Sequence, residues 1–106
     1  MTRSGDAMVK LNLVCPAALA EQLVEYLLES EWLDGGFTSL ATHGHGGDFM
    51  GASPREKVRG RVQSLTVVAI LPTGNVTALL EALRGRFRNP HLVWWTEPVL
   101  GFGDFA

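Results

Sequence analysis

Residues 62–71 read Val-Gln-Ser-Leu-Thr-Val-Val-Ala-Ile-Leu, and this stretch decides the fold. Its β-branched and aliphatic residues predict a β-strand. Successive side chains of a strand point to opposite faces. One face would carry four apolar side chains, Leu65, Val67, Ala69 and Leu71, and the other face would include Val68 and Ile70. We therefore expect both faces of this strand to be covered.

A helix and another strand are predicted downstream. Pro72-Thr73-Gly74-Asn75 indicates a turn in which Thr73 or Asn75 would cap the helix. Apolar residues then recur at helical spacing, at Val76, Leu79, Leu80, Leu83 and Phe87. Asn89-Pro90 would end this helix, and residues 91–97 predict a strand with Trp94 and Trp95 on opposite faces.

The same strand and helix pattern is found upstream. Residues 8–14 alternate between apolar and polar side chains, with Lys10 and Asn12 on the polar side. Pro16 suits a first helical position, and an amphipathic helix of about four turns follows it. Asp34-Gly35-Gly36 would end that helix, because glycine accepts the positive φ found there. Residues 37–42 predict the second strand.

The element order is therefore βαββαβ, which predicts an α+β, ferredoxin-like fold: a four-stranded antiparallel sheet with two helices on one face. We expect one domain over residues 1–106, with residues 1–7 as a loose leader. The second sheet face has apolar residues and no helix of its own. Burial against other subunits is the simplest way to cover it.

Composition limits the functional classes. Hydrophobic residues make up 46% of the chain and charged residues 19%, and the net charge is −2. The charge gives no indication of nucleic-acid binding, and the predicted third strand lacks the stacking aromatics of an RNA-recognition domain. Apolar runs are too short for membrane insertion. No catalytic set of residues is recognisable, so we expect a cytoplasmic protein that is not an enzyme.

Two side-chain groups are candidates for binding. His43, His45 and Asp48 lie in a glycine-rich segment, and imidazole and carboxylate groups suit a divalent metal. The alternative is that these are solvated loop residues. Cys15, the single cysteine, is expected to be a buried small hydrophobe.

A basic row follows that glycine-rich segment. Arg55, Lys57, Arg59 and Arg61 alternate, so an extended chain would project them to one side, toward an anion or an acidic partner. A solvated charge run is the alternative. The arginines at 84, 86 and 88 have a simpler role, because cations complement the dipole at a helix C-terminus.

The long segment between the second and third strands carries a resemblance to a known family. Gly36-Phe37-Thr38-Ser39, Gly44-His45-Gly46 and Glu56-Lys57-Val58-Arg59-Gly60-Arg61 resemble a branch of the PII-like signalling superfamily that is typically encoded beside heavy-metal efflux pumps. The final strand and its glycine-aromatic end are similar too. The order of elements matches over residues 8–106.

This resemblance implies a homotrimer with ligand clefts between subunits, and a partner in a membrane transporter or efflux pump subunit. Residues 43–61 would be the T-loop, the loop that contacts ligand or partner in that superfamily. Its candidate residues are Gly44, Gly46, Gly47, Arg55, Lys57, Arg59 and Arg61. Members that bind adenine nucleotides have a glycine-lysine loop after the second helix, where this chain has Arg86-Phe87-Arg88. Anion contacts here would involve Arg86 and Arg88.

Two functional hypotheses result. The first is a trimeric PII-like regulator that senses a small ligand, such as an adenine nucleotide, and modulates heavy-metal efflux. The second follows from a similarity to CutA-like proteins: an accessory protein that binds a divalent metal through the loop histidines.

Overall fold

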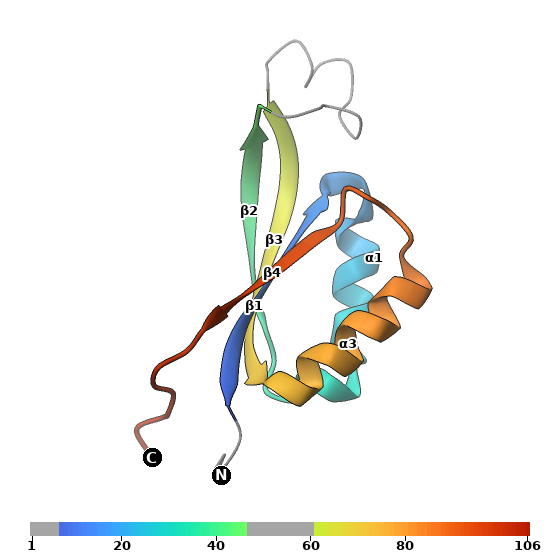
Figure 1. The fold of residues 1–106 in the computed structure, drawn as a ribbon. Coiled ribbons are helices and arrows are strands. Elements are labelled where there is room, and N and C mark those ends of the chain that lie inside the picture. Colours follow the sequence, from blue (N-terminus) through green and yellow to red (C-terminus); the bar gives the residue numbers. More distant parts are fainter. Residues whose placement is uncertain (1–6, 47–60) are drawn as a thin grey trace.

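The computed structural model describes residues 7–46 and 61–106. Its elements are β1 (Met8–Pro16), α1 (Ala17–Leu28), the 3-10 turn η1 (Glu31–Leu33), β2 (Thr38–His45), β3 (Arg61–Pro72), α3 (Thr73–Arg86) and β4 (Val93–Pro98). The strands form one antiparallel sheet in the order β2-β3-β1-β4. Both helices lie on the same side of that sheet (Figure 1). The predicted ferredoxin-like fold is confirmed.

The core lies between the helices and one face of the sheet. Strands β1 and β3 are central and pair along their whole overlap, with Leu11 opposite Ala69 and Leu13 opposite Val67. These four side chains are at most 4% exposed. Buried helix residues complete the core: Leu23, Leu27, Val76, Leu79 and Leu83. The sequence pattern predicted the sheet side of this core correctly.

The first helix is shorter than its hydrophobic pattern suggested. Helix α1 ends at Leu28, and a separate 3-10 turn follows because the Ser30 side chain accepts a hydrogen bond from the Trp32 amide at 3.2 Å. Serine hydroxyls that bond nearby backbone groups interrupt helices in this way. Gly36 does adopt a positive φ of 83°, but it ends the 3-10 turn rather than α1. Pro16 is the last residue of β1 and not the first of the helix.

Neither predicted cap of the second helix acts as a cap. Helix α3 begins directly after Pro72, and no side chain caps it. The Thr73 hydroxyl donates to the Ala7 carbonyl at 3.1 Å, and the Asn75 amide donates to the Trp32 carbonyl at 3.3 Å. Both side chains therefore tie α3 to neighbouring segments. The helix ends at Arg86, three residues before Asn89.

Strands β2 and β3 both extend further than expected. β2 continues through His43, Gly44 and His45, which pair with residues 63, 62 and 61 of β3. Ladder hydrogen bonds to β3 offset the conformational cost of the glycine in this stretch. The predicted insertion at residues 43–61 is thus shorter at both ends.

Candidate functional site

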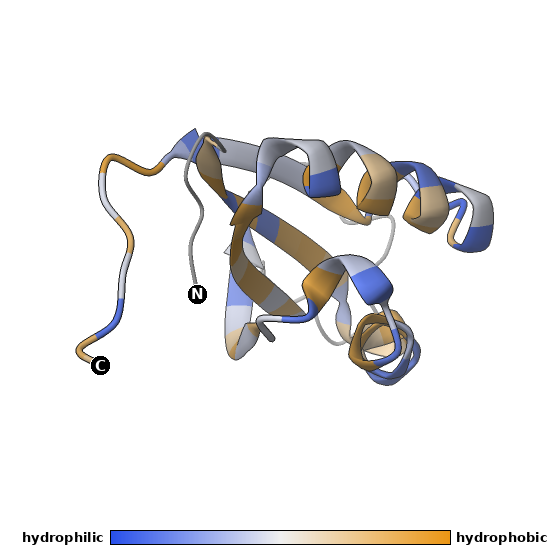
Figure 2. Cartoon of the chain, turned by 90° about the horizontal axis from the view of Figure 1, so that it is seen from below, coloured by the Kyte–Doolittle hydropathy of each residue, from blue (hydrophilic) through white to orange (hydrophobic). Residues whose placement is uncertain are grey.

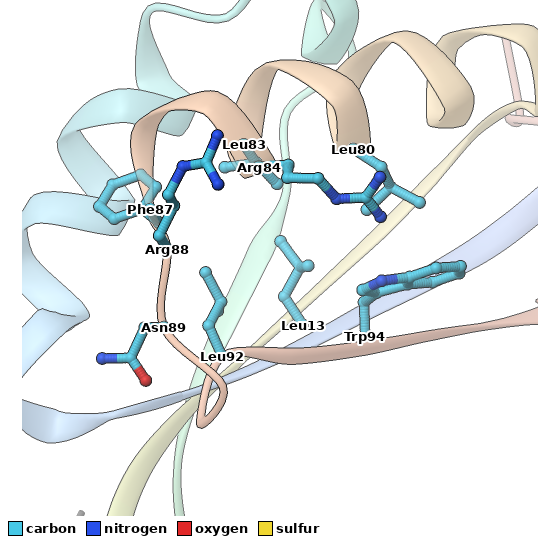
Figure 3. Close-up of a pocket in the computed structure, with 9 residues that line it drawn as sticks. All are labelled: Leu13, Leu80, Leu83, Arg84, Phe87, Arg88, Asn89, Leu92 and Trp94. Carbon is cyan, nitrogen blue, oxygen red and sulfur yellow. The ribbon is translucent and has the colours of Figure 1, made fainter.

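A cavity of about 210 Å³ lies between the C-terminal half of α3, the chain that follows it and the start of β4 (Figure 3). Apolar side chains form most of its wall: Leu13, Leu80, Leu83, Phe87, Leu92 and Trp94. Its size is below the usual range of about 300–1,000 Å³ for small-molecule pockets, so one ring or a small anion would fill it.

Two arginines give this cavity its charge. Arg84 and Arg88 line it together with Asn89, and the nine described residues that line it include no acidic side chain. Figure 3 shows Arg84 of α3 and Trp94 of β4 on facing sides of the cavity. Guanidinium groups beside an aromatic wall suit a planar anion, because they donate several hydrogen bonds and stack on rings. The site therefore combines an apolar interior with a positive rim formed by Arg84 and Arg88, and it is called the arginine-rimmed cavity below.

Arg86 lies elsewhere. Its guanidinium carbon is 4.8 Å from the centre of the Phe87 ring. It lines a different hollow with Gln22, Glu25 and Glu29, where carboxylates complement its charge. Of the two arginines predicted to contact an anion, Arg88 lines the arginine-rimmed cavity and Arg86 does not.

The helix-free face of the sheet contains a polar network centred on Glu97. The Asn12 amide donates to Glu97 Oε2 at 3.0 Å, and Trp95 Nε1 donates to the same oxygen at 2.9 Å. Lys10 Nζ lies 4.0 Å from the other carboxylate oxygen. Asn12 lies on the predicted polar side of β1, but only 3% of it is exposed, because Val68 and Trp95 flank it on the neighbouring strands.

Hydroxyl groups on the same face also satisfy one another. Thr42 Oγ1 lies 2.8 Å from Ser64 Oγ and 2.9 Å from Thr66 Oγ1. Among the described residues, no buried side-chain nitrogen or oxygen lacks a hydrogen-bond partner. This matters for binding, because a face whose polar groups already pair internally can be covered without leaving unsatisfied groups.

His43 and His45 lie two residues apart on β2, so both point to the same side of that strand. Both are exposed. In residues 7–46 and 61–106, no group of three histidine, cysteine or acidic residues is close enough to hold a metal ion. Asp48, the third predicted ligand, lies outside the described residues.

Most of the predicted T-loop also lies outside the described residues, including Gly47, Arg55, Lys57 and Arg59. Gly44 is in β2 opposite Val62, and Gly46 follows that strand with a φ of 75°. The backbone of Arg61 pairs with His45 at the start of β3. The structure therefore places the two ends of this segment side by side at one end of the sheet (Figure 1).

Cys15 is fully buried in the core, as predicted. Desolvation raises the pKa of its thiol, and a backbone hydrogen bond with Leu65 offsets part of that rise. A buried thiol with a raised pKa is a poor nucleophile and a poor metal ligand.

The place of Arg84 in the wall of this cavity was not predicted from the sequence. The sequence did contain an indication of it. Arg84 and Arg88 are four residues apart, and each directly follows an apolar residue, Leu83 or Phe87, which places the two arginines beside the apolar side of the helix. The Asn12–Glu97 pair had no such signal, because 85 positions separate its members along the chain.

Comparison with known proteins identifies the family. The model of the family described as "Protein of unknown function (DUF3240)" matches residues 6–106, and the chain belongs to this family. The crystal structure of a DUF3240 family protein from Shewanella baltica OS155 is similar, with a TM-score of 0.74 and 20% sequence identity. The match covers 94% of this chain and 98% of that one, and it supports the fold. No curated protein matches the sequence. None of the helices in the described part of the chain is long and apolar enough to cross a membrane.

Proposed function

We propose that this protein is a PII-like regulator, a homotrimer that senses a small anion and modulates a membrane transport system for heavy-metal efflux. The observation that carries the proposal is the arginine-rimmed cavity, since it offers an anion two guanidinium groups and a ring. The resemblance of the segment between β2 and β3 to the T-loop of PII-like proteins supplies the expected partner.

The helix-free sheet face supports the assembly part of the proposal. Leu40, Val93 and Trp95 on this face are each 44% to 48% exposed, and Val68 and Ile70 lie between them. An apolar surface of this kind is usually covered by protein. Its polar groups are already paired, so contact with other copies would remove apolar area from water at little polar cost.

Inorganic phosphate and adenine nucleotides are the first ligands to test, because phosphate groups match the two arginines and some members of the resembled superfamily bind adenine nucleotides. Calorimetry would compare ATP, ADP and inorganic phosphate. We expect Arg84→Gln/Arg88→Gln to weaken binding by about 1.5–3 kcal/mol for each charge-assisted hydrogen bond lost. Arg86→Gln is the control for the single variants Arg84→Gln and Arg88→Gln, because it also removes one positive charge near this helix end but leaves the cavity wall unchanged. Equal losses in the control and in these single variants would contradict the assignment of this cavity.

A metal-binding role is the second candidate. The observation that favours it is that His43 and His45 project from the same side of β2. Only neutral imidazole coordinates a metal, so binding of zinc, copper or nickel should release protons and weaken as the pH falls. Calorimetry in buffers of different ionisation enthalpy would detect this release. His43→Ala/His45→Ala should abolish it, whereas Arg84→Gln/Arg88→Gln should leave it unchanged.

A further inference from the structure

Residues 99–106 form a segment that leaves the end of β4 and extends away from the helices (Figure 1). Leu100 and Phe105 are fully exposed in it, and Phe102 is half exposed. Figure 2 shows hydrophobic positions recurring along this segment up to the C label. Large apolar side chains that extend from the body of a protein usually mark a contact with another surface.

The chemistry of the segment matches the arginine-rimmed cavity. Its sequence Phe102-Gly103-Asp104-Phe105 places one carboxylate between two aromatic rings. The cavity offers the complement, apolar walls of a size for one ring and the cationic side chains of Arg84 and Arg88. Seating a phenylalanine would bury a large apolar area, and the neighbouring carboxylate would meet the guanidinium groups at the rim.

The direction of β4 separates the segment from the cavity of its own chain. The cavity lies near the start of β4, at Trp94, and the segment begins after Pro98 at the other end. The chain continues away from the cavity beyond that point (Figure 1). Filling its own cavity would require the segment to reverse direction and pass back along β4. A second copy can present the same segment without any reversal.

We propose that residues 99–106 of one copy dock into the arginine-rimmed cavity of a second copy, with Phe105 between α3 and β4 and Asp104 against Arg84 and Arg88. Such a contact is head-to-tail, and head-to-tail contacts close into rings when the rotation permits. It therefore deepens the trimer of the proposed function, on which it rests. A small anion at Arg84 and Arg88 would compete with the docked segment, which would couple ligand binding to the subunit contact.

Cross-linking between two singly substituted chains tests the docking. One chain carries Phe105→Cys, and the other carries Leu80→Cys at the cavity wall together with an isotopic mass label. The control partner is Thr77→Cys, which is exposed on the same helix and does not line the cavity. After mixing and mild oxidation, we expect the Phe105–Leu80 disulfide to form at least about tenfold faster than the Phe105–Thr77 disulfide, because docking raises the effective concentration.

Equal rates with the two partners would overturn the docking. So would a disulfide that forms only within a chain carrying both Phe105→Cys and Leu80→Cys. As a check on the charge complementarity, Asp104→Lys should slow the intermolecular cross-link, and Arg84→Asp/Arg88→Asp in the other chain should restore it. Persistence of the fast rate in Asp104→Lys alone would contradict the role of the arginines.

The outcomes also separate this inference from the proposed function. A fast cross-link in the wild type, without binding of ATP, ADP or phosphate even in Asp104→Lys, would support the docking and remove the proposed sensing. A trimer by light scattering without a cross-link would remove the docking and leave the assembly in place. A monomer at all concentrations would overturn both.

Discussion

The two faces of the sheet are built from the same strands but have different surroundings. On the helix-covered face, Leu13 and Val67 lie opposite each other and are at most 2% exposed. On the helix-free face, Leu40 and Trp95 keep nearly half of their surface in contact with water. Alternation in a central strand places apolar side chains on both faces of the sheet. The two helices cover only one of these faces.

The polar side chains of the helix-free face form hydrogen bonds with one another. Asn12 is buried there and bonded to Glu97, and three hydroxyl groups on β2 and β3 bond one another. Polar groups that already bond one another can be covered without losing a hydrogen bond. The pairing is therefore compatible with the proposed cover by another copy.

The largest expected effect on stability comes from the helix-covered face. Leu11→Ala should lower the free energy of unfolding by about 2–5 kcal/mol, through lost burial and the cavity left behind. Urea unfolding followed by circular dichroism measures this change. The loss should be the same at all protein concentrations, because Leu11 does not line the arginine-rimmed cavity and packs within its own chain.

For the helix-free face, Val68→Ala should give a loss that grows with protein concentration, since mass action adds the subunit contacts to the stability. A loss that is independent of concentration would mean that this face contributes nothing to assembly.

A smaller effect is expected from the polar network. Asn12→Ala removes the part-buried hydrogen bond to Glu97 and should cost about 1–3 kcal/mol of unfolding free energy. Trp95→Phe removes the other hydrogen bond to the same oxygen at an exposed position. It should cost less than about 1 kcal/mol. Equal losses of stability in the two variants would contradict the view that burial makes the Asn12 hydrogen bond contribute more than the exposed Trp95 hydrogen bond.

The smallest effect concerns Cys15 in the covered core. Burial raises the pKa of this thiol above its ordinary value of 9.0, so the folded protein keeps a proton that the unfolded chain releases. The resulting contribution to stability is complete below pH 9.0 and is lost as the pH rises above it. Urea unfolding across this pH range should therefore show a small loss of stability that is absent in Cys15→Ala. A thiol reagent should label the native protein slowly and the urea-unfolded protein fast.

The fold was largely predictable because its signals are local. The alternation at residues 62–71 and the helical spacing of Val76, Leu79 and Leu83 specify elements without knowledge of distant contacts. Element ends were less predictable, because they depend on partners. Ser30 interrupts a hydrophobic helical pattern, and β3 extends β2 through Gly44.

The candidate site was harder to predict than the fold. The arginine-rimmed cavity forms only when α3 and β4 pack together, so Arg84 read from sequence as a charge at a helix end. The burial of Asn12 was not predictable for the same reason, since its cover comes from the strands on either side. Long-range packing determined both positions.

The central claim, that other copies cover the helix-free face, is tested most directly by the mass in solution. Light scattering at micromolar concentration should give three times the chain mass of 11.5 kDa. Leu40→Asp on this face should reduce that mass to 11.5 kDa, whereas Leu28→Asp on α1, which is more exposed, should leave it unchanged. A wild-type mass of 11.5 kDa would contradict the account.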